Sequence, residues 1–177
     1  MPSADQGISP DRYQCIPRTV IFLRRGDEYL LIKGAPTKRL WAGKYNGIGG
    51  HVERGEDVVT AARRELLEET GLSADLWLCG TITVDAGDPK LGLCLFVFCG
   101  EKIRGEFKTS VEGVVEWIRI QSISHLPVVE DVPDLLEKIH GMKPGDPPFS
   151  ASSHYDSHEK LVLNFLSDQP TRHQGIE

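Results

Sequence analysis

The sequence lacks the cysteine patterns of zinc sites and of disulfide-rich secreted domains. It has four cysteines in 177 residues, with no CxxC pair and no histidines beside them at zinc-ligand spacing. Three of the four, Cys79, Cys94 and Cys99, stand among apolar residues, which favours buried, reduced thiols. A structural zinc site and a disulfide framework are therefore excluded as the organising features of the fold.

The sequence also lacks a segment suited to export or to membrane insertion. Residues 1–16 are polar and contain Pro2 and Pro10, so they do not form the apolar centre of a signal peptide. The longest apolar run, residues 91–99, is too short to cross a bilayer. We therefore expect a cytoplasmic protein that does not contact membranes.

An excess of positive charge is missing as well. Lysine and arginine total 20 against 26 aspartates and glutamates, which gives a formal net charge of −6. Proteins that bind double-stranded nucleic acid through its backbone have the opposite balance, so this class of partner is excluded. An acidic protein can still bind a polyphosphate if divalent cations supply the positive charge.

What is present is the composition of an ordinary globular protein, at a length that suits one domain. Hydrophobic periodicity, glycines and prolines divide the chain into helices and strands. The expected elements are a hairpin at 19–32, a helix at 57–70, strands at 76–84, 91–99 and 114–120, a helix at 131–140 and a final hairpin at 149–166.

The order of these elements predicts an α+β fold in which strands from distant parts of the chain pair in one sheet. Residues 1–16 are expected to form a flexible leader, residues 17–166 the domain, and residues 167–177 a polar tail. We find no internal repeat and no low-complexity tract.

The helix expected at 57–70 carries three carboxylates on one face. Glu65, Glu68 and Glu69 are spaced i, i+3 and i+4, which places them within about a 100° arc. Each such like-charge pair destabilises a helix by roughly 0.2–0.5 kcal/mol, so cations bound to these carboxylates would reduce their mutual repulsion. Carboxylates are ligands that Mg²⁺ prefers. Taken alone, the row is also explained by a solvated helix face on which Arg64 pairs with Glu68.

The residues around this row complete a longer motif. Gly50 is followed after five residues by Glu56 and, after seven more, by the run Arg64-Glu-Leu-Leu-Glu-Glu-Thr-Gly-Leu72. This run matches without a gap the Nudix box, G-x5-E-x7-R-E-U-x-E-E-x-G-U, in which U is aliphatic. The sequence therefore resembles the Nudix hydrolases.

The resemblance implies the Nudix fold, an α/β/α sandwich with a mixed sheet between helices, over residues 17–166. It implies a Mg²⁺ site, in which Mn²⁺ can substitute, formed by the box. The implied roles are metal ligation by Glu65, Glu68, Glu69 and the carbonyl of Gly49, orientation of these carboxylates by Arg64, and support of the loop by Gly50 and Glu56.

The implied mechanism is metal-assisted hydrolysis at a phosphorus atom of the substrate. A glutamate accepts the proton of the attacking water, and Glu69 is the first choice for this role, followed by Glu112. Glu112 also fits the place of a loop acid that binds metal in the oxidised-purine hydrolases of this family. Glu116 is its rival, and either residue is also explained as an exposed loop acid.

Residues 41–50 are similar to the segment that precedes the box in MutT-like 8-oxo-dGTP hydrolases. In those proteins an asparagine at the position of Asn46 contacts the purine, for which an amide offers both a donor and an acceptor. An ordinary Asn-Gly turn is the alternative. Trp41 and Tyr45 are candidates to stack on the base, or else buried aromatic residues.

The same hydrolases carry a tryptophan and a pair of aspartates near the second helix, which stack on the base and read it. Residues 132–135 fall at that place here. They keep one aspartate, Asp134, and no aromatic residue, so the sequence departs from the family's pattern at the base.

Together these features predict a Mg²⁺-dependent enzyme that converts a nucleoside triphosphate, with 8-oxo-dGTP as a candidate, to the monophosphate and pyrophosphate. ADP-ribose, dinucleoside polyphosphates and other nucleoside diphosphate-linked compounds are alternative substrates. The rival from another class is a Nudix module that only binds a nucleotide, but the intact box glutamates favour an enzyme. Homodimers occur in the family, although nothing in this sequence marks an interface.

Overall fold

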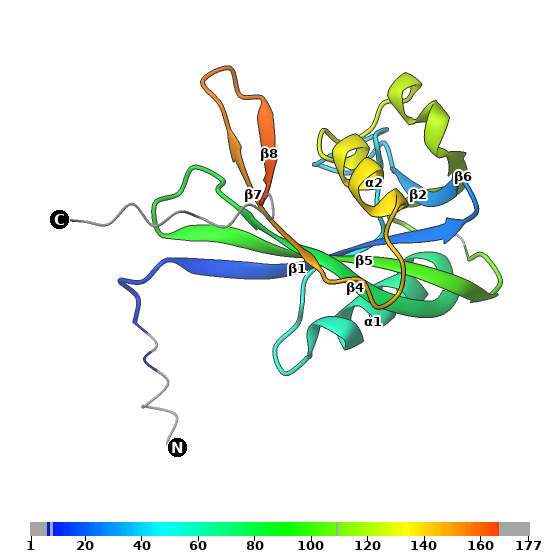
Figure 1. The fold of residues 1–177 in the computed structure, drawn as a ribbon, viewed down its shortest axis with the longest axis horizontal. Coiled ribbons are helices and arrows are strands. Elements are labelled where there is room, and N and C mark those ends of the chain that lie inside the picture. The colour runs from blue at the N-terminus through cyan, green and yellow to red at the C-terminus, as the bar shows by residue number, and fades with distance from the viewer. Residues whose placement is uncertain (1–6, 8, 109, 167–177) are drawn as a thin grey trace.

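The chain folds around one mixed eight-stranded sheet with a helix on each face, as the computed structural model in Figure 1 shows. The structure describes residues 7, 9–108 and 110–166. The elements are β1 (Gln14–Arg25), β2 (Glu28–Gly34), β3 (Tyr45–Asn46), α1 (Val58–Thr70), β4 (Leu72–Val84), β5 (Leu91–Gly105), β6 (Gly113–Arg119), the 3₁₀ helix η2 (Ile120–His125), α2 (Val132–His140), β7 (Phe149–Tyr155) and β8 (Leu161–Phe165).

The sheet joins strands that are far apart in the sequence. Its order is β3-β2-β1-β5-β4-β7-β8, and β6 pairs with β2. β1 runs parallel to β5, and β4 runs parallel to β7, whereas the other named strand pairs are antiparallel. The predicted α+β arrangement, with a mixed sheet between helices, is confirmed.

Strand β1 shows how the two helices divide the core. Val20 and Phe22 belong to the cluster that packs against α2, and Ile21 and Leu23 belong to the cluster that packs against α1. Successive side chains of a strand point to opposite faces, so a strand covered on both sides is apolar without interruption. This is why residues 20–23 form a continuous apolar run rather than an alternating one.

Helix α1 begins and ends at residues with the expected local chemistry. The Asp57 carboxylate accepts hydrogen bonds from the backbone N–H groups of Val59 and Thr60, at 2.9 and 3.0 Å. Gly71 ends the helix in the left-handed conformation, with φ of 76°, which glycine adopts without the steric cost of a side chain. Leu66 is fully buried against the sheet, so the acidic residues project from the opposite side and the edge of the helix.

Helix α2 is attached to the sheet at its C-terminal end by Arg24. This side chain donates hydrogen bonds to the carbonyl oxygens of His140 and Met142, at 3.0 and 3.1 Å, and forms an ion pair with Glu101 at 2.6 Å. The attachment fixes the direction of the helix, so its N-terminal end has a defined place above the sheet (Figure 1).

The structure differs from the sequence-based boundaries at several strand ends. β1 begins at Gln14, within the segment expected as a leader, because the Gln14 N–H pairs with the carbonyl of Lys90. β4 and β5 are longer than expected, since they continue past the register shift between Ser73 and Asp75 as a ribbon with polar residues. The expected tail at 167–177 lies outside the described residues. In the described part of the chain, no helix is long and apolar enough to cross a membrane.

Candidate functional site

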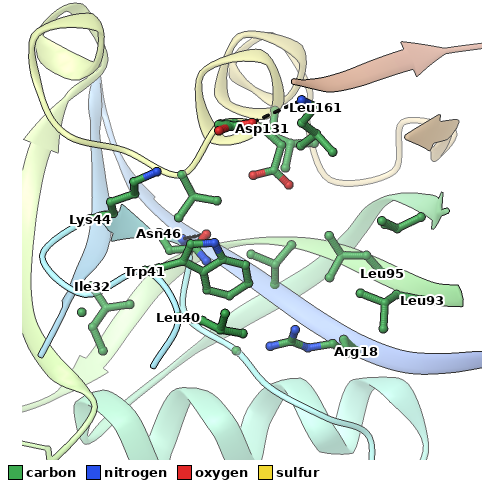
Figure 2. A pocket seen from close by; sticks show the side chains of 18 of the residues that line it. Arg18, Ile32, Leu40, Trp41, Lys44, Asn46, Leu93, Leu95, Asp131 and Leu161 are labelled. Carbon is green, nitrogen blue, oxygen red and sulfur yellow. Dashed lines mark hydrogen bonds between the residues drawn. The ribbon is translucent and has the colours of Figure 1, made fainter. Parts of the chain in front are cut away.

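A cavity of about 220 Å³ opens between the sheet and the start of α2 (Figure 2). Its walls come from β1, the loop before β3, the centre of the sheet, α2 and the C-terminal hairpin β7–β8. The apolar lining residues include Val20, Leu93, Leu95, Leu135 and Leu161, and the polar ones include Arg18, Lys38, Asn46, Glu69, Glu130 and Asp131. A mostly apolar cleft with a few convergent polar groups is typical of a small-molecule site.

Asn46 and Trp41 line this cavity, as their predicted role in base binding requires. The side-chain oxygen of Asn46 accepts a hydrogen bond from the Gly47 N–H at 2.8 Å, so the local turn and a place in the cavity occur together. Trp41 is 39% exposed and adopts a left-handed backbone conformation, with φ of 59°.

Tyr45 does not line the cavity. Its hydroxyl donates a hydrogen bond to Glu116 at 3.0 Å, and the residue is buried in the core. Because Tyr45 and Asn46 are neighbours in β3, their side chains point to opposite faces of the strand. The interpretation of Tyr45 as a buried aromatic residue is therefore the one that fits, and Glu116 is its hydrogen-bond partner.

Asp134, the other residue expected at the base, is exposed and does not line the cavity. The acids in that place are Glu130 and Asp131, directly before the first residue of α2. Burial raises the pKa of Asp131, and the nearby Asp134 and Glu130 raise it further. The sequence predicts Asp134 from residues 132–135, whereas the two acids that directly precede α2 are the ones that line the cavity.

An acidic pair thus stands at the cavity where the sequence analysis found a single acid. Glu130 also accepts a hydrogen bond from the backbone N–H of Leu161 at 3.2 Å, which ties the C-terminal hairpin to the start of α2. The sequence did carry a signal for this pair, because two consecutive acids immediately precede the apolar face of the helix.

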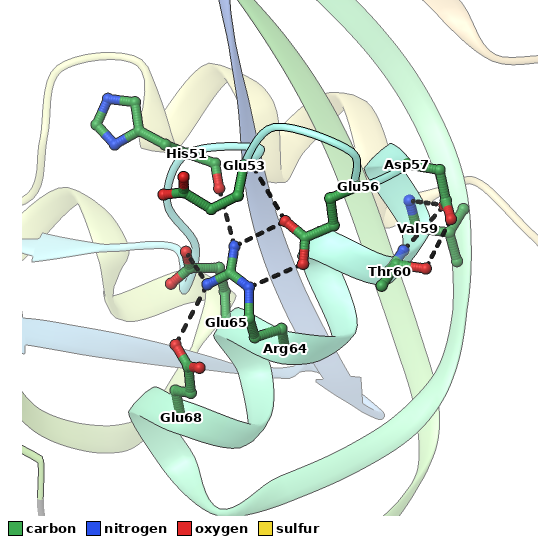
Figure 3. A network of polar contacts seen from close by, with 9 residues as sticks. All are labelled: His51, Glu53, Glu56, Asp57, Val59, Thr60, Arg64, Glu65 and Glu68. Carbon is green, nitrogen blue, oxygen red and sulfur yellow. Dashed lines mark hydrogen bonds and ion pairs between the residues drawn. The ribbon is translucent and has the colours of Figure 1, made fainter.

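Beside the cavity, the Nudix-box residues form one network centred on Arg64 (Figure 3). The guanidinium holds Glu56 with two hydrogen bonds of 2.9 and 3.0 Å and donates to Glu65 at 2.7 Å and to Glu68 at 3.2 Å. It also donates to the carbonyl of His51 at 3.0 Å. These bonds raise the pKa of Arg64, and the same Arg64 lowers the pKa of Glu56. The network ties the loop before α1 to the helix.

Glu69 lies on the inner side of the acidic row, at the edge of the cavity. It is 8% exposed, and its carboxylate accepts a hydrogen bond from the Gly49 N–H at 3.2 Å. Burial raises its pKa to about 7, with Glu65 and Glu112 adding to the shift and Gly49 and Lys38 opposing it. A carboxylate with a pKa near neutrality can accept a proton in a reaction at neutral pH.

The raised pKa of Glu69 predicts a pH-dependent stability of the metal-free protein. An ordinary glutamate titrates at 4.5, so the folded chain binds this proton more tightly than the unfolded chain does. The contribution to stability is complete below pH 4.5 and is lost as the pH rises through about 7. We expect Glu69→Gln to stabilise the metal-free protein by about 3 kcal/mol above pH 7 and by little near pH 4.5. Urea unfolding with a chelator at several pH values measures the difference, and equal differences at all pH values would contradict it.

At Gly49 and Gly50 the backbone of the loop before α1 lies in close contact with the box acids and with β1. A Cβ atom at Gly50 would lie 2.5 Å from the Glu65 carboxylate, and one at Gly49 would lie 2.2 Å from the carbonyl oxygen of Thr19. The Thr19 N–H also donates to the Gly50 carbonyl at 2.8 Å. This loop therefore has room for glycine alone.

The donor set of the box suits a hard divalent cation. Within the described ranges, no three acidic, histidine or cysteine side chains are gathered as a complete metal-binding group. Glu65 and Glu68 bond to Arg64, and Glu112 pairs with Lys38 at 2.5 Å. The buried Glu69 carboxylate, however, has no ion-pair partner among the described residues and faces Glu65 and Glu112. Its uncompensated charge, among oxygen donors alone, is what a divalent cation would neutralise.

Two lysines and Arg18 complete the charged lining, and the sequence analysis did not identify them. Lys38 and Lys44 come from the loop between β2 and β3, and Arg18 comes from β1. The sequence offered no local pattern for them, because the strand and the loop meet only through the pairing of the sheet.

Comparison with known proteins gives a family and a fold. The model of the NUDIX domain matches residues 16–155. The oxidized purine nucleoside triphosphate hydrolase of Mus musculus is 34% identical over 107 residues, which cover 59% of this chain and 67% of that protein. The protein of the same name from Danio rerio is 38% identical over 95 residues, covering 52% and 60%. The crystal structure of the MutT protein from Bacillus halodurans matches with a TM-score of 0.72 and 24% identity, covering 88% of this chain and 99% of that one.

Proposed function

This chain belongs to the NUDIX family of hydrolases, and we propose that it is a Mg²⁺-dependent enzyme that converts a nucleoside triphosphate to the monophosphate and pyrophosphate. One observation supports this substrate class most strongly. The buried acid of the box, Glu69, lies at the edge of a cavity that is lined by Asn46 and Trp41. A base in the cavity would place the phosphates of the same nucleotide beside the acids.

The residues that would hold the metal are Glu65, Glu68 and Glu69, with the Gly49 carbonyl. When bound, the metal supplies positive charge to the phosphates and lowers the pKa of a water. Arg64 keeps the carboxylates in position through its hydrogen bonds to Glu65 and Glu68. We assign to Glu69 the acceptance of the proton of the attacking water, because it is the buried acid of the row and lies at the edge of the cavity.

Glu112 is a further candidate ligand or base. It lies close enough to Glu69 to raise the pKa of that residue. Its ion pair with Lys38 holds it beside the box acids, and Lys38 itself lines the cavity. A phosphate group at this edge would compete with Glu112 for the lysine and thereby release the carboxylate toward a cation.

We infer that the cavity takes a purine, and an oxidised purine such as that of 8-oxo-dGTP is the first candidate. Asn46 offers the base an amide, and Trp41 offers an aromatic face. Asp131, whose pKa is raised by burial, donates a hydrogen bond when it is protonated and accepts one when it is not. The names of the mouse and zebrafish relatives point to the same class of substrate.

A hydrolysis panel tests the proposal. It compares 8-oxo-dGTP, the ordinary nucleoside triphosphates, ADP-ribose and a diadenosine polyphosphate with Mg²⁺ and with a chelator, and identifies the products by chromatography. We expect monophosphate and pyrophosphate from a purine triphosphate, only with the metal. Faster cleavage of ADP-ribose or of the dinucleotide would overturn the substrate class but keep the hydrolase.

The replacement Asn46→Ala is expected to change the preference among bases more than the rate for any one of them. The amide lines the cavity and forms no hydrogen bond with the box acids, so we expect its loss to remove contacts to the base. One lost hydrogen bond changes the ratio of kcat/KM between two bases by roughly 5- to 20-fold. Steady-state kinetics on the panel measures the ratio, and an equal loss for every nucleotide would refute the role.

A further inference from the structure

Arg18 is a charged residue on an otherwise apolar part of the cavity wall. It stands in β1 opposite Leu95 of the parallel strand β5, and its side chain shares the inner face of the sheet with Val20. Figure 2 shows its guanidinium pointing from the strand toward Leu40, below the ring of Trp41. Leu93 lies on the same wall.

This guanidinium has unused hydrogen-bonding capacity. Its Nε atom is buried and finds no hydrogen-bond partner, and among the residues that the structure describes no carboxylate forms an ion pair with it. Burial lowers the pKa of Arg18, although Glu65 and Glu69 act in the opposite direction. A buried donor without an acceptor costs free energy, and it is therefore unusual unless a ligand supplies the acceptor.

Trp41 covers this charge. The Arg18 guanidinium carbon lies 5.8 Å from the centroid of the Trp41 ring, within the range of a cation–π contact. The tryptophan does so from a left-handed conformation, which is costly for a residue other than glycine. A short turn, closed by a hydrogen bond from the Lys44 N–H to the Trp41 carbonyl at 3.0 Å, holds it there. Strain of this kind occurs where a side chain is positioned for binding.

The surroundings decide which part of a nucleotide meets Arg18. Val20, Leu93 and Leu95 make this wall apolar, which suits a flat heterocycle better than hydrated phosphate groups. Arg18 lies near enough to Glu65 and Glu69 for both acids to raise its pKa, and a cation bound to those acids would take the phosphates. A guanidinium only donates hydrogen bonds, so it favours a carbonyl oxygen over an amino group or a C–H at the same position.

We propose that Arg18 is a specificity-determining residue that donates a hydrogen bond to the carbonyl oxygen added to an oxidised purine, and that it thereby favours such purines over their parent purines. This inference rests on the proposed function in one respect, namely that the cavity holds the base. It needs no hydrolysis, so the two proposals can be tested separately.

Binding of nucleoside monophosphates, which have no anhydride to cleave, tests the role of Arg18 alone. Calorimetry with Mg²⁺ present compares 8-oxo-dGMP with dGMP and 2-oxo-dAMP with dAMP. We expect the native protein to prefer the oxidised partner in at least one pair. Arg18→Met, which keeps the apolar stem, should weaken binding of that partner by about 10- to 100-fold and change binding of its parent less than about threefold.

Two further variants complete the test. Arg18→Lys keeps the charge and should recover part of the preference, whereas Arg119→Gln, which removes an exposed arginine from β6, should leave all four affinities unchanged. No preference in the native protein, or equal weakening of both partners by Arg18→Met, would overturn the inference. A preference that depends on Arg18 in a protein that hydrolyses no triphosphate would support it while the proposed function fails.

Discussion

Replacing Glu69 with glutamine is expected to lower kcat by about three orders of magnitude or more. Glutamine keeps the size of the side chain but can neither accept the proton of the attacking water nor bring negative charge to a cation. Glu69 is also the most buried acid of the row, so water from the solvent cannot take over the role of its carboxylate. KM should change far less than kcat, since the base contacts the cavity elsewhere. Steady-state and single-turnover hydrolysis with Mg²⁺ measures both constants.

A matched variant separates this effect from a general loss of charge. Glu137→Gln makes the same chemical change on the exposed side of α2 and should leave kcat as it is. Circular dichroism should show both variants folded, because the buried glutamine loses the cost of a desolvated charge. Near-normal turnover by Glu69→Gln would refute its role and turn attention to Glu112.

The replacement Gly49→Ala is expected to destabilise the fold by more than about 3 kcal/mol. The new Cβ would lie 2.2 Å from the Thr19 carbonyl oxygen, which is backbone and cannot rotate away. The φ of 148° is a second obstacle to a side chain. Relief requires the loop to leave β1, which breaks the pair of hydrogen bonds between Ile21 and Ile48, at 2.6 and 3.0 Å. Hydrolysis should fall with stability, because the same movement withdraws the Gly49 N–H from Glu69.

Gly145→Ala is the control that measures the cost of a side chain at a positive φ without a steric contact. Gly145 also has a positive φ, of 97°, but a Cβ there would meet no atom within 4 Å. Its replacement should cost about 1 kcal/mol from backbone strain alone. Urea unfolding of both variants at one pH gives the comparison. Equal losses in the free energy of unfolding would show that the contact with Thr19 does not destabilise the Gly49→Ala variant.

The acids of the box could be predicted because their geometry is local. A helix fixes the relation of Glu65, Glu68 and Glu69 through its own period, and Asp57 and Gly71 mark its ends in the sequence. The structure adds that Glu69 alone is buried and that Arg64 joins the other two. The fold class followed in the same way, from the order of strands and helices.

The cavity could be predicted only in part, because its geometry depends on pairing between distant strands. The sequence offers Asn46 as a base contact and Tyr45 as a stacking or a buried residue, and the alternation of β3 places only Asn46 in the cavity. The sequence predicts Asp134 at the base, whereas Asp131, three residues earlier, lines the cavity, because the start of α2 decides which acid faces inward. Arg18 reaches the cavity only through the parallel pairing of β1 with β5, which leaves no mark in the local sequence.

The hydrogen bond from the Leu161 N–H to Glu130 has a consequence for how such a protein diversifies. It makes the last hairpin part of the cavity wall, while the acidic row stands on α1, which covers the opposite face of the sheet (Figure 1). Under the proposed function, a mutation in the hairpin would change a wall that meets the nucleotide and leave the acids of α1 in place. The hairpin is thus a part of the cavity whose sequence can vary without a change in the box.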